Sequence, residues 1–166
     1  MDRRNFMIRT GGFVMGLGGL FAAPNLFAKT VQNGIKKIVK NKAEWQKILS
    51  PLAYDVLREE ATEKPFSSVL DKEYGPGIYV CAGCDLELFT SEMKYDSGTG
   101  WPSFFESIPN HLETKIDFKL FFPRTEYHCA RCDGHQGHIF NDGPKPTGKR
   151  WCNNGVALRF MPTGKK

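Results

Sequence analysis

Two pairs of cysteines have the spacing of a metal site. Cys81 and Cys84 are separated by two residues, and so are Cys129 and Cys132. Two thiolates at this spacing can reach one tetrahedral zinc ion from a tight turn, and two such turns fill all four coordination positions. We therefore predict one structural Zn²⁺ per chain, without an open position for water or substrate. Disulfides are the alternative if the chain reaches an oxidising compartment.

The fifth cysteine, Cys152, is left over from these pairs. On a strand, its side chain would share a face with Arg150 and Asn154. A positive charge and a polar amide beside a thiol favour the thiolate, which is the nucleophilic form. The same face would also carry Val156 and Leu158, so the alternative is a small buried core residue, as lone cysteines usually are.

Two further segments carry side chains that could serve such a nucleophile. His135 and His138 lie in a glycine-rich segment that we expect to form a turn. Two imidazoles near a spare thiol are suited to acid–base chemistry. Trp101 lies in a loop rich in glycine and proline, where an indole can form the wall of a pocket. Hydrogen-bonded loop histidines and a core tryptophan are the alternatives.

The elements that must position these side chains are two short helices followed by strands. Asn41 with Glu44 resembles a capping box at a helix start, and Ser50 followed by Pro51 starts a second helix. Beyond about residue 73, Gly and Pro separate short runs, and residues 116–122 and 156–160 alternate with a period of two. This order predicts a mainly β fold of antiparallel sheets, a sandwich or an open barrel, with short N-terminal helices.

The N-terminal segment has the three-part layout of an export signal. Arg3 and Arg4 precede a glycine-rich apolar run over residues 11–23, and a cut site follows at Ala28, although Leu26 stands where a small residue is usual. The arginine pair resembles a twin-arginine signal. We predict a signal over residues 1–28, a linker over 29–40 and one domain over 41–166, exported to the bacterial periplasm. A short N-terminal amphipathic or buried helix is the alternative.

Composition limits the remaining classes. The chain has 166 residues, of which 40% are hydrophobic and 25% charged, so one globular domain is expected and disorder is excluded. No run reaches the ~18 apolar residues of a membrane span. The predicted signal holds three of the 23 basic and one of the 18 acidic residues, so the net charge falls from +5 to +3. This mild excess does not indicate a nucleic-acid partner.

Together these segments resemble the methionine sulfoxide reductase B family, the peptide-methionine (R)-S-oxide reductases. The resemblance extends from about residue 41 to 161. It is carried by residues 57–58, 62–66, 81–84, 100–104, 135–144 and 146–154. The order and number of these motifs make a chance match very improbable, and the family's fold is mainly β with helices on the N-terminal side.

The resemblance implies a role for each residue that matches a family motif. Cys152 is the catalytic cysteine by this resemblance; His135, His138 and Asn154 are active-site residues; Trp101 and Phe140 line the substrate pocket; and Cys81, Cys84, Cys129 and Cys132 hold the zinc. A thiolate would attack the sulfoxide sulfur of an oxidised protein while a histidine, or a water that it holds, protonates the oxygen. The cysteine would become a sulfenic acid.

One position departs from the family pattern. Many members carry a resolving cysteine in the loop before Trp101, and this chain has Thr99 there. We therefore predict that an external thiol or a thioredoxin-like protein reduces Cys152, and that the enzyme is a monomer. A secreted zinc-ribbon binding module without catalysis is the rival interpretation. A thiol–disulfide oxidoreductase would need a βαβ context that the chain lacks.

Overall fold

The computed structural model describes residues 34–119 and 122–164. The predicted signal over residues 1–28 lies outside these residues. Two helices come first, α1 (Lys42–Ile48) and α2 (Pro51–Glu59). The side chain of Asn41 accepts the Glu44 backbone N–H and the Glu44 carboxylate accepts that of Asn41, so the predicted capping box is confirmed. Ser50 caps α2, whose first residue is Pro51, as predicted.

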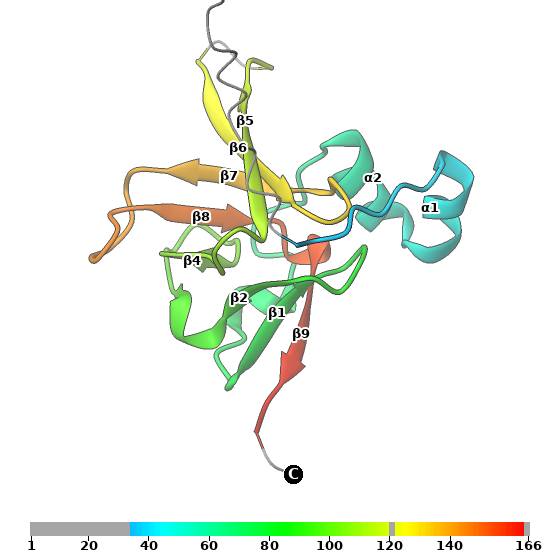
Figure 1. The fold of residues 1–166 in the computed structure, drawn as a ribbon. Helices are drawn as coiled ribbons and strands as arrows, with labels where there is room; N and C mark the ends of the chain where they lie inside the picture. Colours follow the sequence, from blue (N-terminus) through cyan, green and yellow to red (C-terminus); the bar gives the residue numbers. More distant parts are fainter. Residues whose placement is uncertain (1–33, 120–121, 165–166) are drawn as a thin grey trace, which may run out of the picture. The chain divides into compact units, whose positions relative to one another are not determined.

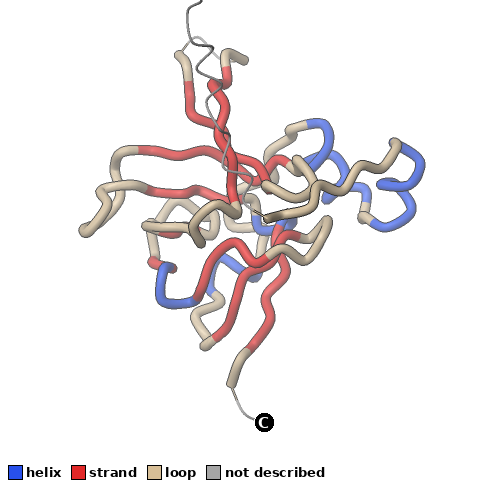
Figure 2. Tube along the Cα trace, viewed as in Figure 1, coloured by secondary structure: helices blue, strands red, loops and turns tan. Residues whose placement is uncertain are grey.

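In the described part of the chain, nine strands follow in two antiparallel sheets. Figures 1 and 2 show their arrangement. The smaller sheet has the order β2-β1-β9, and the larger has the order β3-β4-β8-β7-β6-β5. The strands are β1 (Gly77–Cys81), β2 (Glu87–Thr90), β3 (Lys94–Tyr95), β4 (Ser103–Phe104), β5 (Leu112–Asp117), β6 (Arg124–Cys129), β7 (His135–Phe140), β8 (Arg150–Asn153) and β9 (Leu158–Pro162). Short 3₁₀ turns cover Val69–Lys72, Ser91–Met93 and Gly155–Ala157. The predicted mainly β fold behind two short helices is therefore confirmed.

An aromatic core joins the two sheets. Tyr79 and Phe89 of the smaller sheet, and Phe104 and Tyr127 of the larger, are completely buried. Phe89 stacks on Phe104 with ring centroids 4.0 Å apart, and Tyr79 meets Phe104 edge-on at 5.0 Å. Each such pair adds about 0.5–1.5 kcal/mol beyond the burial of its area. The core thus holds the sheet that carries β8 against the sheet that carries β1.

Only some of the large apolar residues of the two helices are buried. Trp45 of α1, and Val56 and Leu57 of α2, are buried, whereas Ile48 and Leu52 are exposed. The guanidinium of Arg58 in α2 donates to the carbonyl oxygen of Cys132, at 2.7 Å. This bond connects the end of α2 to the turn between β6 and β7.

Two of the predicted strands have different bounds. Only the first two residues of the alternating run 116–122 belong to a strand, because β5 ends at Asp117. The side chains of Ile116, Phe118 and Phe122 are exposed. The run 156–160 is divided, because Gly155–Ala157 forms a 3₁₀ turn and β9 begins at Leu158. This turn carries the chain from the larger sheet to the smaller one. Cys152 therefore does not share a strand with the apolar residues that follow it.

The described part of the predicted linker, residues 34–40, forms neither helix nor strand. Its Ile38 N–H donates to the carbonyl oxygen of Arg131, at 2.7 Å, and Lys37 pairs with Glu113 and Asp133. Within the described residues, none of the helices has the length and apolar character that crossing a membrane requires.

Candidate active site

Cys152 lies beside a small cavity at the middle of the larger sheet. Strand β8 runs between β4 and β7, where Cys152 is paired with Ser103 on one side and His138 on the other. Directly opposed residues on antiparallel strands have Cβ atoms about 4.5–5.5 Å apart, so the thiol and the imidazole of His138 are neighbours. The cavity has a volume of about 130 Å³ and is lined by Thr62, Trp101, Arg124, Gly137, His138, Phe140, Cys152, Asn153 and Asn154.

The environment of Cys152 disfavours its thiolate form. Burial raises the pKa of Cys152 above its ordinary value, and this effect exceeds the opposing effects of Arg150 and Thr99. Arg150 is itself paired with Asp142, whose two carboxylate oxygens each lie 2.9 Å from a guanidinium nitrogen. The sequence favoured a thiolate beside a positive charge. The charge is present but shared with Asp142, so it only partly offsets the cost of burial.

His135 and His138 lie on a strand, not in the turn that the glycines suggested. Residues three apart on a regular strand point to opposite faces. Here the register with β6 shifts, because His128 pairs with His135 while Tyr127 pairs with Gly137, which leaves Gln136 as an extra residue. Such a bulge changes the direction of side chains, and the two imidazole centroids are 5.4 Å apart.

Each histidine has an acidic neighbour. The Nε2 atom of His138 lies 2.9 Å from a carboxylate oxygen of Asp117, which Arg124 contacts at 2.6 Å. The Lys119 backbone N–H, followed by His138 and Arg124, lowers the pKa of Asp117 far below its ordinary value. Asp117 is therefore charged, and it fixes the orientation of the His138 ring.

His135 lies behind the cavity and does not line it. Its side chain is buried, and its Nδ1 atom is 2.9 Å from a carboxylate oxygen of Glu126, which is also buried. Burial lowers the pKa of His135, although Glu126 opposes the change. The structure thus brings His138 to the thiol and places His135 beneath it, next to the His138 ring.

Trp101 and Asn154 are positioned by one segment that precedes the sheets. The indole N–H of Trp101 donates to the Glu63 carbonyl oxygen, at 3.2 Å, and the Glu63 N–H donates to the side-chain oxygen of Asn154, at 3.0 Å. The Glu63 carboxylate accepts the backbone N–H groups of Gly155 and Val156. Asn154 and Trp101 both line the cavity, but the Asn154 amide is engaged mainly in holding the turn after β8.

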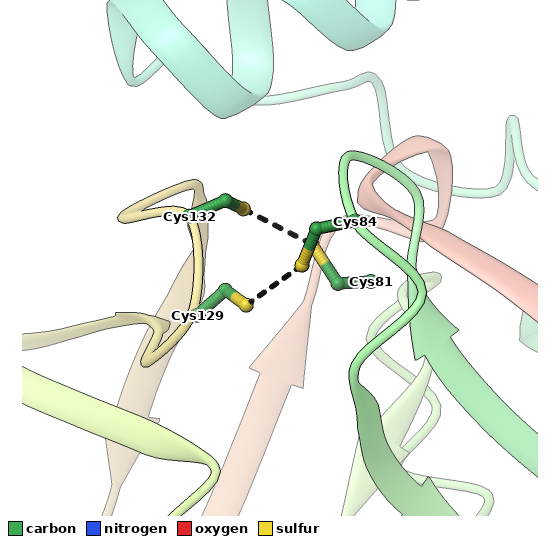
Figure 3. Close-up of side chains that lie close together, drawn as sticks. All are labelled: Cys81, Cys84, Cys129 and Cys132. Carbon is green, nitrogen blue, oxygen red and sulfur yellow. Dashed lines mark hydrogen bonds between the residues drawn. The ribbon is translucent and has the colours of Figure 1, made fainter. Parts of the chain in front are cut away.

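The four paired cysteines meet at the tips of two turns, one after β1 and one after β6 (Figure 3). Their Sγ atoms all lie within 4.8 Å of one another, with Cys81 and Cys132 at 3.6 Å and Cys84 and Cys129 at 3.4 Å. Tetrahedral zinc with ~2.3 Å bonds separates its sulfur ligands by roughly 3.8 Å, whereas a disulfide requires about 2.05 Å. Three of the four cysteines are buried. The donor set therefore fits a structural zinc ion.

Several residues of this site were not found from the sequence. Asp117 and Glu126 accompany the histidines, Arg124 lines the cavity, and Glu63 joins Trp101 to the turn after β8. Asp117 could have been noticed as an acidic residue within the alternating apolar run 116–122. No local signal marks Glu126, because its contact with His135 depends on the pairing of β6 with β7.

The chain is similar to known proteins over most of its length. A family model described as the SelR domain matches residues 49–162. The chain is 46% identical to a peptide methionine sulfoxide reductase MsrB of Bradyrhizobium diazoefficiens over 140 residues, which cover 84% of this chain and 99% of that protein. It is 48% identical over 126 residues to the MsrB of Methanosarcina barkeri, covering 75% of this chain and 89% of that protein. A mitochondrial methionine-R-sulfoxide reductase B2 of Rattus norvegicus is 47% identical over 135 residues, with coverages of 76% and 78%.

Proposed function

Because the chain belongs to the SelR-domain family of methionine sulfoxide reductases B, we propose that it reduces methionine (R)-sulfoxide in oxidised proteins to methionine. The observation that carries this proposal is the grouping of Cys152, His138 and Trp101 around one cavity. The cavity admits a small side chain, and its only thiol among the described residues is Cys152. The name of the rat relative, a methionine-R-sulfoxide reductase, supports the R epimer.

In this mechanism the Cys152 sulfur attacks the sulfoxide sulfur, and the S–O bond of the substrate breaks. The oxygen is transferred to Cys152, which becomes a sulfenic acid, while methionine is released, so cysteine is oxidised and the sulfoxide is reduced. His138, oriented by Asp117, donates the proton that the developing oxyanion requires. A positioned acid of this kind contributes about 10²–10⁴-fold to the rate. His135 supports the His138 ring from behind the cavity.

The walls of the cavity select the substrate. The Trp101 indole and the Phe140 ring provide apolar surfaces for the methyl group on the sulfoxide sulfur. Arg150 lies over the Phe140 ring, with its guanidinium carbon 4.3 Å from the ring centroid, which fixes that wall. With the methyl group on one side and His138 on the other, only one epimer presents its oxygen to the acid.

An external thiol restores the enzyme. The four paired cysteines occupy the zinc site, and Thr99 stands where a resolving cysteine would be. A thiol attacks the sulfenic acid to form a mixed disulfide and water, and a second thiol then releases Cys152 and leaves with the first as a disulfide. A thioredoxin-like protein or a small thiol fits this role. Detection of an intrachain disulfide to Cys152 during turnover would contradict it.

One Zn²⁺ held by Cys81, Cys84, Cys129 and Cys132 completes the protein. When bound, it supplies no reactive position, because the four thiolates fill its coordination sphere. Its ligands come from the ends of β1 and β6 and from the turns that follow them, so they link the smaller sheet to the larger one. We propose that the enzyme acts as a monomer and that it has no nucleic-acid partner.

The activity is tested with peptides that contain separated R and S sulfoxides, with dithiothreitol as the reductant. The R peptide should be consumed and the S peptide should not. Cys152→Ser should abolish turnover while zinc content and far-UV circular dichroism stay unchanged, which also separates the reductase from a zinc-binding module. Equal turnover of both epimers, or of neither, refutes the proposal.

We also propose that residues 1–28 form a twin-arginine export signal, that residues 29–40 form a linker, and that the domain over residues 41–166 works in the bacterial periplasm. The support is the Arg3–Arg4 pair before an apolar run. Changing both arginines to lysine should leave the protein in the cytoplasm, whereas the natural chain should be exported and begin at Lys29. Export of both forms to the same extent would contradict this assignment.

A further inference from the structure

A completely buried glutamine lies between the four cysteines and the strand that carries Cys152. The Gln136 side chain has no exposed surface. Its amide nitrogen lies 3.3 Å from Cys81 Sγ, and its amide oxygen accepts a hydrogen bond from the side chain of Asn153, also at 3.3 Å. Asn153 follows Cys152 directly in β8. One side chain therefore contacts a metal-ligating sulfur at one atom and the nucleophile's strand at another.

The backbone of Gln136 holds the same stretch. Its carbonyl oxygen accepts both the backbone N–H of Asn154, at 2.8 Å, and the side-chain N–H of Asn154, at 3.0 Å. The Tyr127 hydroxyl donates to the side-chain oxygen of Asn153, at 2.8 Å, so that amide has a defined orientation. The side-chain polar atoms of Gln136 and Asn153 are all hydrogen-bonded, which makes this network stiff.

The bulge in β7 explains why this position is available. Gln136 is the extra residue between His135 and Gly137, so its side chain is not required to alternate with theirs. His138 lines the cavity beside Cys152, and the Gln136 side chain reaches the sulfur cluster. A regular strand could not place a glutamine toward Cys81 while keeping the His135 and His138 rings together.

We propose that Gln136 is a positioning residue that couples the metal site to the placement of Cys152, an inference that rests on the proposed zinc-dependent reductase. Its N–H group donates to the Cys81 thiolate, so it stabilises the negative charge on that sulfur and fixes its position as a metal ligand. Its carbonyl groups fix Asn153 and Asn154, and with them the end of β8. Outer partners of this kind typically change metal affinity by about 10–100-fold when they are removed.

The first test needs no substitution. In protein loaded with ¹¹³Cd in place of zinc, a hydrogen bond from the Gln136 amide to Cys81 should give a measurable scalar coupling between cadmium and the Gln136 side-chain N–H proton. A resolved Gln136 amide signal without that coupling would overturn the proposal, whatever the activity of the protein.

The second test uses Gln136→Met, because methionine has a similar length and lacks the amide. The cobalt-substituted variant should show its sulfur-to-metal charge-transfer absorption at longer wavelength, since the thiolate has lost a hydrogen bond. Metal release should be faster by about tenfold or more. The kcat for the R-sulfoxide peptide should fall with KM nearly unchanged, because Trp101 and Phe140 are not touched. Gln46→Met, an exposed glutamine of α1, is the matched control and should change none of these quantities.

The outcomes separate the inference from the function on which it rests. If the natural chain binds no zinc or reduces neither epimer, the proposed function fails. If it does both, and Gln136→Met keeps the natural charge-transfer spectrum and metal-release rate, the inference fails. A fall in kcat without a spectral shift would also overturn it, because Gln136 would then be only a packing residue.

Discussion

At Gly137, the addition of a single methyl group should have a large effect on catalysis. It lies between the two histidines of β7 and pairs with Asn153 of β8. A Cβ atom at this position would overlap the carbonyl oxygen of Cys152 and would lie 3.0 Å from its carbonyl carbon and 3.2 Å from the Asn153 Cα. All three atoms belong to the backbone, so no side-chain rotation can relieve the overlap. Gly137→Ala must therefore separate β7 from β8 beside the thiol.

The size of the effect follows from that displacement. Overpacking of a buried position costs about 1–3 kcal/mol of unfolding free energy. A shift of about 1 Å in the placement of Cys152 against the imidazole of His138 costs on the order of 10² in rate. We therefore expect Gly137→Ala to lower kcat/KM for the R-sulfoxide peptide by about 10²-fold, or roughly 2.7 kcal/mol, beyond its effect on stability.

The assay compares two alanine variants by urea unfolding and by R-sulfoxide turnover with dithiothreitol. Gly164→Ala is the control, because a Cβ there would have only one neighbour within 4 Å, a Pro76 carbon at 3.7 Å. It should behave like the natural chain in both measurements. A Gly137→Ala protein with natural stability and natural kcat/KM would show that Cys152 need not lie where the pairing of β7 with β8 places it.

Three further outcomes follow from the site. Burial raises the pKa of Cys152, so the rate of its alkylation by iodoacetamide should still increase at pH values where the rate for free cysteine is constant. Mass spectrometry measures this rate, and a midpoint of rate against pH equal to or below that of free cysteine would contradict the prediction. Asp117→Asn removes a charged partner worth about 1.5–3 kcal/mol from His138, so kcat/KM should fall about 10–100-fold. Asp55→Asn, at an exposed residue of α2, should match the natural chain. Tyr127→Phe leaves a buried amide oxygen unpaired, so unfolding in urea should show a loss of about 1–2 kcal/mol; an unchanged midpoint would refute the bond.

The parts of the fold that depend on local chemistry were predicted from the sequence. The capping box at Asn41 and the proline that starts α2 both act within a few residues. The exits from strands were not predicted. Alternation continues past Asp117 in the sequence, but the chain leaves β5 there. An alternating pattern predicts which face of a strand each residue would occupy, but it does not predict whether a partner strand is present.

The functional site shows the same difference between what local sequence predicts and what strand pairing decides. Family motifs placed Cys152, His138, Trp101, Phe140 and Asn154 at what proves to be a single cavity. The predicted turn at the histidines is wrong, because the glycine between them lies in β7 and permits the close approach of β7 and β8. The acidic partners were missed, since contacts across strands are set by register, and a bulge alters register without a clear mark in the sequence.

The order of strands has a consequence for how the domain forms. Strand β8 enters the larger sheet between β4 and β7, and β9 completes the smaller sheet by pairing Cys81 with Leu158, 77 residues later. Contacts so distant along the chain slow folding, because the intervening loop must close before the pairing compensates for it. Strands β5 to β8 can pair in chain order, but β4 cannot pair with β8, nor β1 with β9, until residues 150–162 are in place. A chaperone bound to residues 150–162 would therefore keep both sheets incomplete until it dissociates.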